Sequence, residues 1–381
     1  MHLRGVILIV SSEFYPMPAA GASRVIPMVS VLESFCDRIS VLTSNDAKEN
    51  NNVERSFFSV PSNKSKLPFR LLQELLLGID LGIRIFLKKD VRLCIITSPP
   101  FFMASCCALF AKLSGKKYVF DVRDRYPRVL EDLGVLKLTG FLGKILKDIE
   151  SWVYRGASQV TTVTNGLLTE LRNDFPDTCF NLLRNGFDEE VFGEEVLNVS
   201  KNQSFTVVHH GRLGRFYDLQ LFTQVIKSVE ELDPEIKFLL IGDFPPELLN
   251  LRAGNLKILP MMELEDLSRN LVKCHIGICL LKNLPAMKNA FPAKSYDFIG
   301  AGLPQIIGPS GEFCDLISKY GAGIVLKDIN PLEIAQEIVN LKNDNQRFFE
   351  MSDNVSNIRK FFGRREIVKS FFSINKIRDL K

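Results

Sequence analysis

The chain of 381 residues is long enough for two full-sized domains of roughly 150 residues each. Hydrophobic residues make up 46% and charged residues 24%, a balance that excludes a disordered chain and a multi-span membrane protein. The net charge of +4 is small for this length, so we expect no nucleic-acid partner. Eight cysteines lie mostly in apolar runs without the spacing of a disulfide framework, which predicts reduced thiols and a cytosolic protein.

No segment has the pattern of a secretory signal or of a membrane span. The apolar stretch nearest the N-terminus, residues 6–10, is short and is followed by Ser11 and Ser12. The longest nearly apolar run, residues 99–111, falls below the roughly 18 residues that a spanning helix needs. We therefore expect a cytoplasmic protein that is not exported.

Short β-branched runs alternate with helical patterns in the first half of the chain, which is typical of βαβ units and parallel sheets. Strands are expected at residues 5–11, 39–43, 93–97, 118–121 and 159–163, and helices at residues 22–35, 101–113 and 141–154. The chain then becomes polar and irregular between Arg184 and Ser204, where we expect a hinge.

The second half repeats the same alternation. Its expected elements lie at residues 205–209, 219–231, 236–241, 264–272, 275–280, 293–300, 305–307 and 323–326. Each half opens with a strand, a glycine-bearing loop and a helix, and ligands of such sheets bind beyond the carboxyl ends of the strands. The sequence thus predicts an α/β protein of two facing, doubly wound domains with a cleft between them.

Residues 289–304 form the most informative segment, a loop that leads into a helix. Lys294 falls in the first turn, where free backbone N–H groups and the helix dipole favour an anion such as phosphate. Asp297 lies three residues further on the same face, where a carboxylate could accept hydrogen bonds from ribose hydroxyls. The pattern indicates a nucleotide site; a solvated Lys–Asp pair on a helix surface remains an equal alternative from this fragment alone.

The sequence gives no indication of a metal or a bound cofactor. No Asp-x-Asp, Gly-x-Gly-x-x-Gly or Walker loop occurs. His209 and His210 would point to opposite faces of a strand, and Cys274, His275 and Cys279 are expected in the core. We therefore expect neither a metal site nor a cofactor.

The segment at 289–304 resembles the donor site of retaining glycosyltransferases of family 4, in particular the bacterial subgroup with a Pro-x-Lys motif. Further matches follow in the same order along the chain: residues 7–11 with 14–16 and Gly21, residues 97–100, 120–127 and 185–188, and Gly242-Asp243. The resemblance covers essentially the whole chain and implies the GT-B fold, two facing Rossmann-like domains. It implies an acceptor-binding domain at residues 1–198, a nucleotide-sugar domain at 199–358, and a last helix at 359–381 that crosses back to the first domain.

The resemblance also assigns roles to residues. Lys294, Arg212 and Arg215 would stabilise the departing diphosphate, with a solvated arginine as the alternative for either arginine. Asp297 would hold the ribose, and the donor site would also include Asn289, Gly211, Pro292 and Ala293. Asp124 would be the catalytic carboxylate on the acceptor side, beside Gly21, Asp121 and Arg123, unless it only braces its loop through an ion pair with Arg123. The family usually has glutamates where this chain has Asn289 and Asp297.

The implied activity is retaining transfer of a sugar from a nucleotide diphosphate sugar, with UDP expected, to a polyprenyl-linked or other glycan acceptor. The setting would be the assembly of a bacterial surface polysaccharide such as O-antigen or capsule. Two alternatives stay open. One is a nucleotide-sugar epimerase or hydrolase with the same fold, and the other is a non-catalytic partner of another transferase, which the departure at Asn289 favours.

Residues 64–92 combine apolar side chains with seven basic and three acidic residues, a net charge of +4. Such a segment is typical either of a helix that docks on a lipid surface or of an ordinary domain helix, and the two are equally expected. Docking would place the protein peripherally at the inner face of the cytoplasmic membrane. The aromatic residues of the basic tail, among them Phe371 and Phe372, are expected in the core instead.

Overall fold

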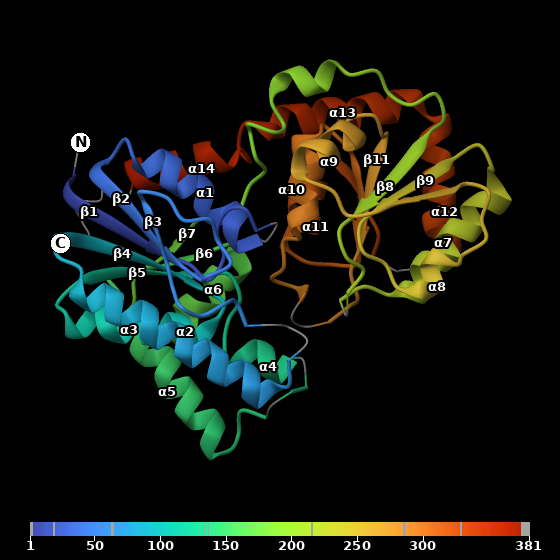
Figure 1. The fold of residues 1–381 in the computed structure, drawn as a ribbon. Helices are drawn as coiled ribbons and strands as arrows, with labels where there is room; N and C mark the ends of the chain where they lie inside the picture. Colours follow the sequence, from blue (N-terminus) through green and yellow to red (C-terminus); the bar gives the residue numbers. More distant parts are fainter. Residues whose placement is uncertain are drawn as a thin grey trace. The chain divides into compact units, whose positions relative to one another are not determined.

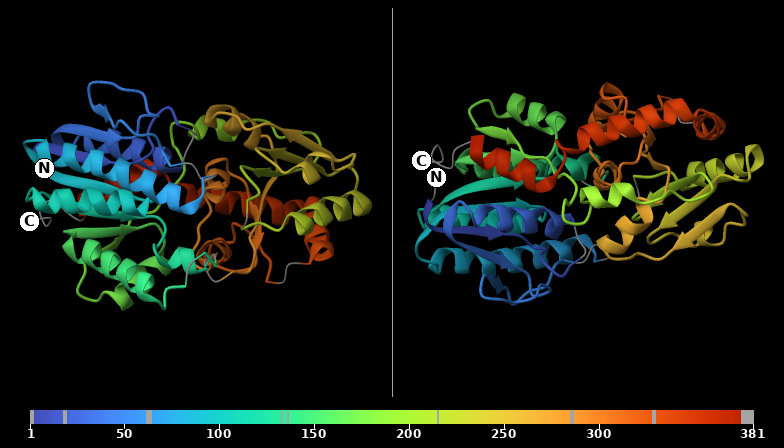
Figure 2. Two further views of the ribbon diagram at one scale, coloured as in Figure 1. Left: turned by 60° about the horizontal axis from the view of Figure 1, so that its bottom comes forward. Right: turned by 90° about the horizontal axis from the view of Figure 1, so that it is seen from above.

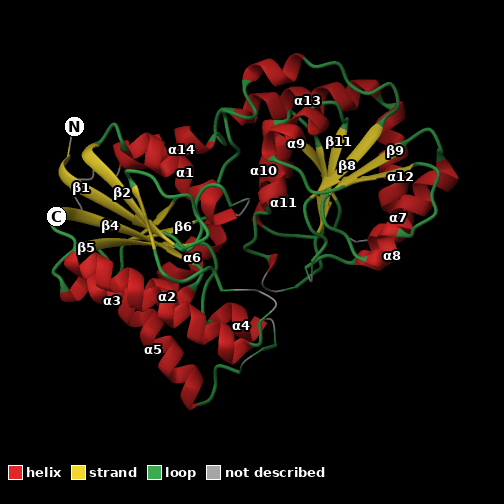
Figure 3. Ribbon diagram, in the orientation of Figure 1, coloured by secondary structure: helices red, strands yellow, loops and turns green. Residues whose placement is uncertain are grey.

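The structure is a computed structural model that describes residues 3–17, 20–61, 65–132, 134–135, 137–214, 216–284, 287–327 and 330–374. It forms two compact units, Met1–Arg184 with Ile367–Lys381, and Asn185–Glu366. Each unit is a parallel sheet with helices on both faces (Figures 1 and 3). The prediction of two doubly wound α/β domains is confirmed.

The first unit contains a seven-stranded sheet in the order β3-β2-β1-β4-β5-β6-β7. Every neighbouring pair is parallel, with Ile9 beside Val41 on one side and Ile95 on the other. The strands are β1 (Leu3–Val10), β2 (Cys36–Thr43), β3 (Val53–Arg55), β4 (Val91–Ser98), β5 (Lys117–Val122), β6 (Gln159–Thr162) and β7 (Phe180–Leu182). Because the central strands are buried on both faces, they read as continuous apolar runs.

Helices cover both faces of this sheet. They are α1 (Ala20–Leu32), α2 (Leu67–Leu87), α3 (Phe101–Leu113), α4 (Arg128–Asp132), α5 (Phe141–Gly156) and α6 (Asn165–Asp174). Helices α2, α3, α5 and α6 share one core with Leu8, Ile96 and Phe120 of the sheet. Helix α1 packs on the opposite face, where Val368, Phe371 and Phe372 of the C-terminal segment complete the core.

The second unit contains a six-stranded parallel sheet in the order β10-β9-β8-β11-β12-β13. The strands are β8 (Thr206–His210), β9 (Lys237–Ile241), β10 (Leu256–Leu259), β11 (Ile276–Leu280), β12 (Gln305–Gly308) and β13 (Gly323–Val325). Its helices are α7 (Leu219–Leu232), α8 (Pro246–Leu249), α9 (Leu264–Leu271), α10 (Ala293–Gly300), α11 (Glu312–Lys319), α12 (Pro331–Asn343) and α13 (Asn345–Arg359), and α14 (Arg364–Ile374) follows. A short 3₁₀ helix, Glu194–Asn198, precedes β8.

The division of the chain differs from the boundary that the sequence suggested at 198/199. Phe187 and Phe192 are buried in the core of the second unit, and Phe187 N donates to the carbonyl of Phe362 over 2.9 Å. Arg359 also belongs there, since its Nε donates to Gly300 O over 3.0 Å. The irregular segment before β8 is therefore held by packing against α10 and α13, a contact that no local pattern reveals.

All eight cysteines are free, and six of them are buried. Burial raises the pKa of the Cys94 thiol to about 12, so it stays protonated near neutral pH. Among the helices that the structure describes, none has the length and apolar character to cross a bilayer.

Candidate functional site

The site begins at the N-terminal end of α10 in the second unit. Phe291 stacks on Tyr296 with ring centroids 4.1 Å apart, which anchors the entry into the helix. Phe298 lies against Gly277 of β11, where an added Cβ would clash with the aromatic ring. These contacts hold α10 close to the sheet and bury its residue Lys294, which is 8% exposed.

The ammonium group of Lys294 is held by two side chains that the sequence does not place beside it. Its Nζ lies 2.9 Å from His209 Nε2 and 4.2 Å from the centroid of the Tyr217 ring. His209 Nδ1 lies 3.0 Å from the carbonyl oxygen of Ile278, which only accepts hydrogen bonds. The imidazole is therefore the Nδ1–H tautomer, and its Nε2 lone pair accepts from Lys294.

Burial lowers the pKa of Lys294 from 10.5 to about 8, with the nearby Cys279 and Asp297 acting in the opposite direction. Lys294 thus remains mostly protonated at pH 7, in a place where water screens its charge poorly. Burial and the Lys294 charge together keep the pKa of His209 well below its ordinary value, so His209 is a neutral acceptor.

Asp297 lies one turn after Lys294, as the sequence predicts. Its Oδ2 is 3.5 Å from His210 Nε2. Burial raises the pKa of Asp297 to about 7; Arg364 opposes this shift and Asp188 reinforces it. Burial and Lys294 lower the pKa of His210 to about 3, so that imidazole is neutral beside the carboxyl group. The carboxyl group of Asp297 is poised to change charge near neutral pH.

The loops after β8 and β9 meet beside this group. Gly211 N donates to Ile241 O over 2.8 Å, and Gly242, with φ of +154°, leaves no room for a Cβ against the carbonyl of Gly211. Arg212 is exposed, and its Nε lies 3.4 Å from Asp243 Oδ2 in an equally exposed ion pair. Arg215 lies outside the described residues. Arg212 is therefore exposed to solvent, and its role at a diphosphate stays a prediction.

The remaining predicted donor-site residues lie along the entry to α10. Pro292 is the residue before the helix and Ala293 is its first residue; Pro292 and Asn289 are half-buried, and Ala293 is exposed. These three positions precede Lys294 in the sequence, and none of them is buried in the core.

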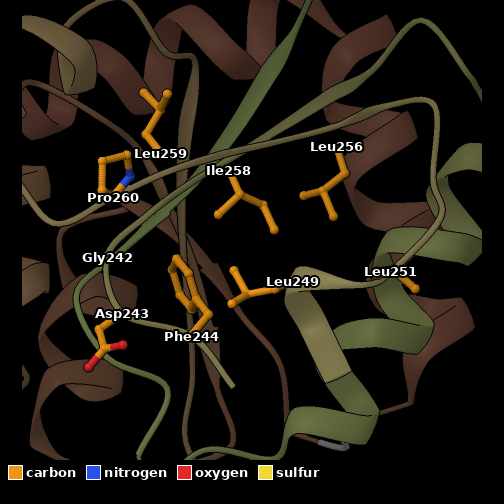
Figure 4. A pocket seen from close by; sticks show the side chains of 9 residues that line it. All are labelled: Gly242, Asp243, Phe244, Leu249, Leu251, Leu256, Ile258, Leu259 and Pro260. Carbon is orange, nitrogen blue, oxygen red and sulfur yellow. The ribbon is translucent and has the colours of Figure 1, made fainter. Parts of the chain in front are cut away.

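A pocket of about 460 Å³ lies along the edge strand β10, next to the loop after β9. Leu249 and Ile258 point into it toward one another, and Phe244 adds an aromatic ring beside them (Figure 4). Apart from Asp243, its lining is apolar or backbone. This pocket could not be predicted from the sequence, because its walls come from a loop, a short helix and an edge strand that are brought together only by the pairing of β10 with β9.

In the first unit, the predicted acceptor-side residues follow β5 and begin α1. Asp121 is wholly buried: Arg24 donates to both of its carboxylate oxygens over 2.7 Å, and Thr161 Oγ1 donates to Oδ1 over 2.6 Å. Burial alone would raise the pKa of Asp121, but the Arg24 charge and these hydrogen bonds outweigh it and lower the pKa. The expectation that Asp121 faces an acceptor is therefore corrected; it joins α1 to the sheet.

Two of the other acceptor-side residues lie nearer the surface, whereas Gly21 is buried. Asp124 is exposed, and Arg123 is half-buried with its guanidinium donating to Pro99 O over 3.0 Å. Gly21 N donates to Glu13 Oε2 over 2.9 Å. An added Cβ at Gly21 would meet Glu13 and approach Arg123, so this turn is closely packed. Of the predicted carboxylates in the first unit, Asp124 is the one available to a ligand.

Among the described residues, no three His, Cys, Asp or Glu side chains come close enough together to hold a metal ion. The residues that sequence reasoning missed are His209 and Tyr217, the partners of Lys294. The one sequence feature that pointed to His209 was the pair of histidines at the end of the strand. The alternation of side chains along a strand places these two histidines on opposite faces of the sheet. His209 faces Lys294 and His210 faces Asp297. Both histidines therefore contribute to the same site, although they lie on opposite faces of β8.

No protein-family model matches the chain. It is similar to the probable glycosyltransferase WbjE of Pseudomonas aeruginosa, with 20% identity over 303 residues that cover 75% of each protein. Among solved structures it is similar to HepE of Anabaena in complex with UDP and glucose (TM-score 0.68, 14% identity, 97% of this chain and 99% of HepE).

The fold is also that of sucrose-phosphate synthase from Thermosynechococcus elongatus (TM-score 0.71, 11% identity, 98% of both chains). A putative UDP-N-acetylglucosamine 2-epimerase of Listeria monocytogenes matches as well (TM-score 0.64, 10% identity, 99% of this chain and 97% of that one). The chain therefore has the GT-B fold, which the sequence analysis predicted.

Proposed function

We propose that the protein is a retaining glycosyltransferase of the family 4 type. It would transfer a sugar from a UDP-sugar to a polyprenyl-linked or other glycan acceptor, in the assembly of a bacterial surface polysaccharide such as O-antigen or capsule. The observation that carries the proposal is the buried Lys294 ammonium at the start of α10, held by His209 and Tyr217. The likeness to WbjE, and to HepE solved with UDP and glucose, supports it.

The chemistry of such a transfer requires a fixed positive charge. When the bond between the sugar C1 and the diphosphate oxygen breaks, the departing diphosphate gains negative charge. A cation that is already oriented and desolvated stabilises this charge without reorganising at the moment of reaction. Lys294 meets both conditions, because its Nζ has a fixed acceptor in His209 Nε2 and is shielded by the Tyr217 ring.

The other roles follow from position. Asp297, one turn further along α10, would accept hydrogen bonds from the ribose hydroxyls. The apolar pocket with Phe244 offers a surface for a planar base. Asp124 would orient or deprotonate the acceptor hydroxyl, since it is an exposed carboxylate of the first unit. Arg212, which is exposed, would add positive charge at the diphosphate by exchanging solvent for phosphate, and Arg215 keeps the same predicted role from the sequence.

A second candidate function is nucleotide-sugar epimerisation or hydrolysis, favoured by the likeness to the putative Listeria epimerase. Such an enzyme consumes the UDP-sugar without an acceptor. A third candidate is a non-catalytic partner of another transferase, which Asn289 favours because its amide lacks the charge of a carboxylate. A partner of this kind would bind the donor and leave it unchanged.

The test is thermal unfolding with a panel of UDP-sugars, followed by turnover with and without glycan acceptors. A ligand at 100 times its Kd raises the free energy of unfolding by about 2.7 kcal/mol, which a melting experiment resolves.

Lys294→Ala should reduce turnover by roughly 10²–10³-fold, as the loss of one preorganised charge donor does elsewhere. Asp297→Ala should chiefly weaken UDP binding.

Lys227→Ala is the matched control, because Lys227 is an exposed lysine on α7 of the same unit. Turnover of Lys294→Ala within threefold of wild type, with a normal melting temperature, would place the diphosphate elsewhere. Acceptor-independent conversion of the donor would favour the epimerase or hydrolase, and donor binding without any conversion would favour the non-catalytic partner.

A further inference from the structure

The solvent-facing side of α2 is apolar for most of its length. Its exposed residues between positions 72 and 87 are all leucine, isoleucine or phenylalanine, with exposed fractions of 38–69%: Leu72, Leu75, Leu76, Ile79, Ile83, Phe86 and Leu87. We call these seven residues the α2 row. A surface helix of a globular protein normally presents charged and polar residues on this side.

The charged residues of α2 are turned toward the protein instead. Glu74 is 4% exposed and accepts from Arg70 Nε over 3.1 Å. Asp80 accepts from the backbone N–H of Phe57 over 3.0 Å and lies 3.4 Å from Arg84 Nε. Both carboxylates are thus used inside the unit, and no carboxylate belongs to the α2 row.

Two glycines fix this orientation of the helix. Gly78 and Gly82 face α3, where an added Cβ would lie 2.8 Å from Met103 Cα in the first case and would clash with the Phe110 ring in the second. The glycines therefore do not interrupt the helix; they let α2 and α3 lie side by side (Figures 1 and 2). Rotating the α2 row inward would push bulky side chains into this contact.

The other helices on this face of the sheet also expose apolar and basic side chains. On the same face of the sheet, Leu113 of α3 is 64% exposed and Phe141 of α5 is 83% exposed. These elements expose five lysines and two aspartates, so their exposed charge is net positive: Lys66 just before α2, Lys89 and Asp90 just after it, Lys112 on α3, and Lys144, Lys147 and Asp148 on α5. Lys88 is paired with Glu54, and Lys64 lies outside the described residues.

We propose that the α2 row and the neighbouring lysines form a docking surface for an anionic phospholipid bilayer. The row spans about 22 Å at roughly 1.5 Å per residue, which suits a helix lying flat in the headgroup region with its apolar side in the acyl boundary. The lysines at both ends would contact lipid phosphates. Charge complementarity selects this occupant over a second copy of the chain.

A symmetric pairing of two α2 rows brings like charges together in either direction. Antiparallel rows place Lys66 of one copy near Lys89 of the other, and parallel rows pair each lysine with its own equivalent. The row itself has no carboxylate, and the two exposed aspartates, Asp90 beside Lys89 and Asp148 on α5, are fewer than the five exposed lysines. An anionic bilayer satisfies the apolar row and the lysines at once.

The experiment measures partitioning of the full chain onto vesicles of phosphatidylcholine with or without phosphatidylglycerol. Sedimentation gives the partition coefficient, and energy transfer from Trp152, the single tryptophan, to a dansyl lipid gives an independent signal. We expect stronger binding to the vesicles with phosphatidylglycerol, and a loss of most of the difference at high salt. The double variant Ile79→Gln with Ile83→Gln should bind at least about tenfold more weakly.

Lys66→Gln with Lys89→Gln should reduce the preference for phosphatidylglycerol by about tenfold or more, since each basic residue near an anionic bilayer strengthens the attraction to it. Leu332→Gln with Phe349→Gln is the matched control, because both residues are exposed in the second unit. Circular dichroism melting shows that each variant folds. Equal binding to both vesicle types, or no effect of the Ile79 and Ile83 changes, overturns the proposal. Dimerisation that those two changes abolish, without vesicle binding, assigns the row to a second copy instead.

Discussion

At the scale of single residues, Lys294 shows how the protein keeps a charge where burial disfavours it. Its ammonium lies against the lone pair of His209 and the face of Tyr217, with Cys279 and the Asp297 carboxyl group nearby. The two side chains of β8 that touch this group, His209 and His210, are both neutral, so the positive charge stays on Lys294. A diphosphate would supply the counter-charge that this arrangement lacks.

The pH dependence of stability checks the burial of Lys294. Its pKa is about 8 in the folded protein and 10.5 as the ordinary value, so between these pH values the unfolded chain holds the extra proton. Stability then rises with pH, because the slope follows the protons bound by the unfolded state minus those bound by the native state. Relative to Lys294→Met, wild type should gain on the order of 1–3 kcal/mol from pH 8 to 10.5 in denaturant titrations. A constant difference over this range would contradict the lowered pKa.

The contribution of Asp297 to the free energy of unfolding should change with pH in the opposite direction, and at lower pH. Its pKa is about 7 in the folded protein against an ordinary 3.8, so the native state holds the extra proton between these values and stability falls as pH rises. Compared with Asp297→Asn, wild type should lose on the order of 1–3 kcal/mol between pH 4 and 7. A difference between wild type and Asp297→Asn that stays constant from pH 4 to 7 would contradict the raised pKa of Asp297.

At the scale of elements, a buried ion pair ties α1 to the first sheet. Arg24 of α1 contacts Asp121 at the end of β5 and also donates to the carbonyl of Leu183, just after β7, over 2.8 Å. Thr161 of β6 completes the group through Asp121. The pair therefore joins one helix to three neighbouring strands at the carboxyl edge, next to the loop that carries Asp124.

Removing one partner of this pair should be costly. Arg24→Met leaves the Asp121 carboxylate buried without its counter-charge, and we expect a loss of about 3–5 kcal/mol in the free energy of unfolding. Arg269→Met, which breaks an exposed pair with Asp266, should change stability by less than about 1 kcal/mol. Restoration of most of the loss by adding Asp121→Asn would show that the unpaired charge causes it. A small effect of Arg24→Met alone would mean that water reaches Asp121.

At the scale of the whole molecule, two units built on one plan have different sites. The carboxyl edge of the second sheet carries the buried cation Lys294 with Asp297, and that of the first sheet carries the exposed Asp124 above the Arg24–Asp121 pair. The apolar α2 row with its lysines belongs to the first unit only. The shared plan therefore sets where a site lies, and the side chains at each edge set its chemistry.

Turnover should not depend on a divalent cation. Lys294 would take the charge role at the diphosphate, and cationic side chains can replace a metal in this role. Activity with the preferred donor should be unchanged within about twofold in EDTA, measured as release of UDP or of the sugar product. Activity that is lost in EDTA and returns with Mg²⁺ or Mn²⁺ would falsify this view of the leaving group.

The alternation of strands and helices in both halves, and a candidate site at the start of α10, could be predicted from the amino-acid sequence. Strands such as β1, β4 and β11 can be recognised by their local apolar runs. Short connections between alternating strands and helices favour a parallel, doubly wound sheet. The residue types at the start of α10 indicate an anion site because a helix N-terminus has the same free N–H groups in any fold. Short elements such as β3, β7 and α8 were not predicted because three or four residues hold no readable period, and the longer helices α6, α11, α12 and α13 were not predicted either.

Only the tertiary structure decided which distant residues meet. His209 and Lys294 are 85 positions apart, and Arg24 and Asp121 are 97 apart, so neither contact leaves a trace in a local pattern. The spacing of apolar residues in the sequence likewise indicates a helix at α2. The packing of Gly78 and Gly82 against α3 decides which side of that helix is exposed. Contacts of this kind depend on strand order and on the face from which each helix packs, and those are properties of the assembled chain.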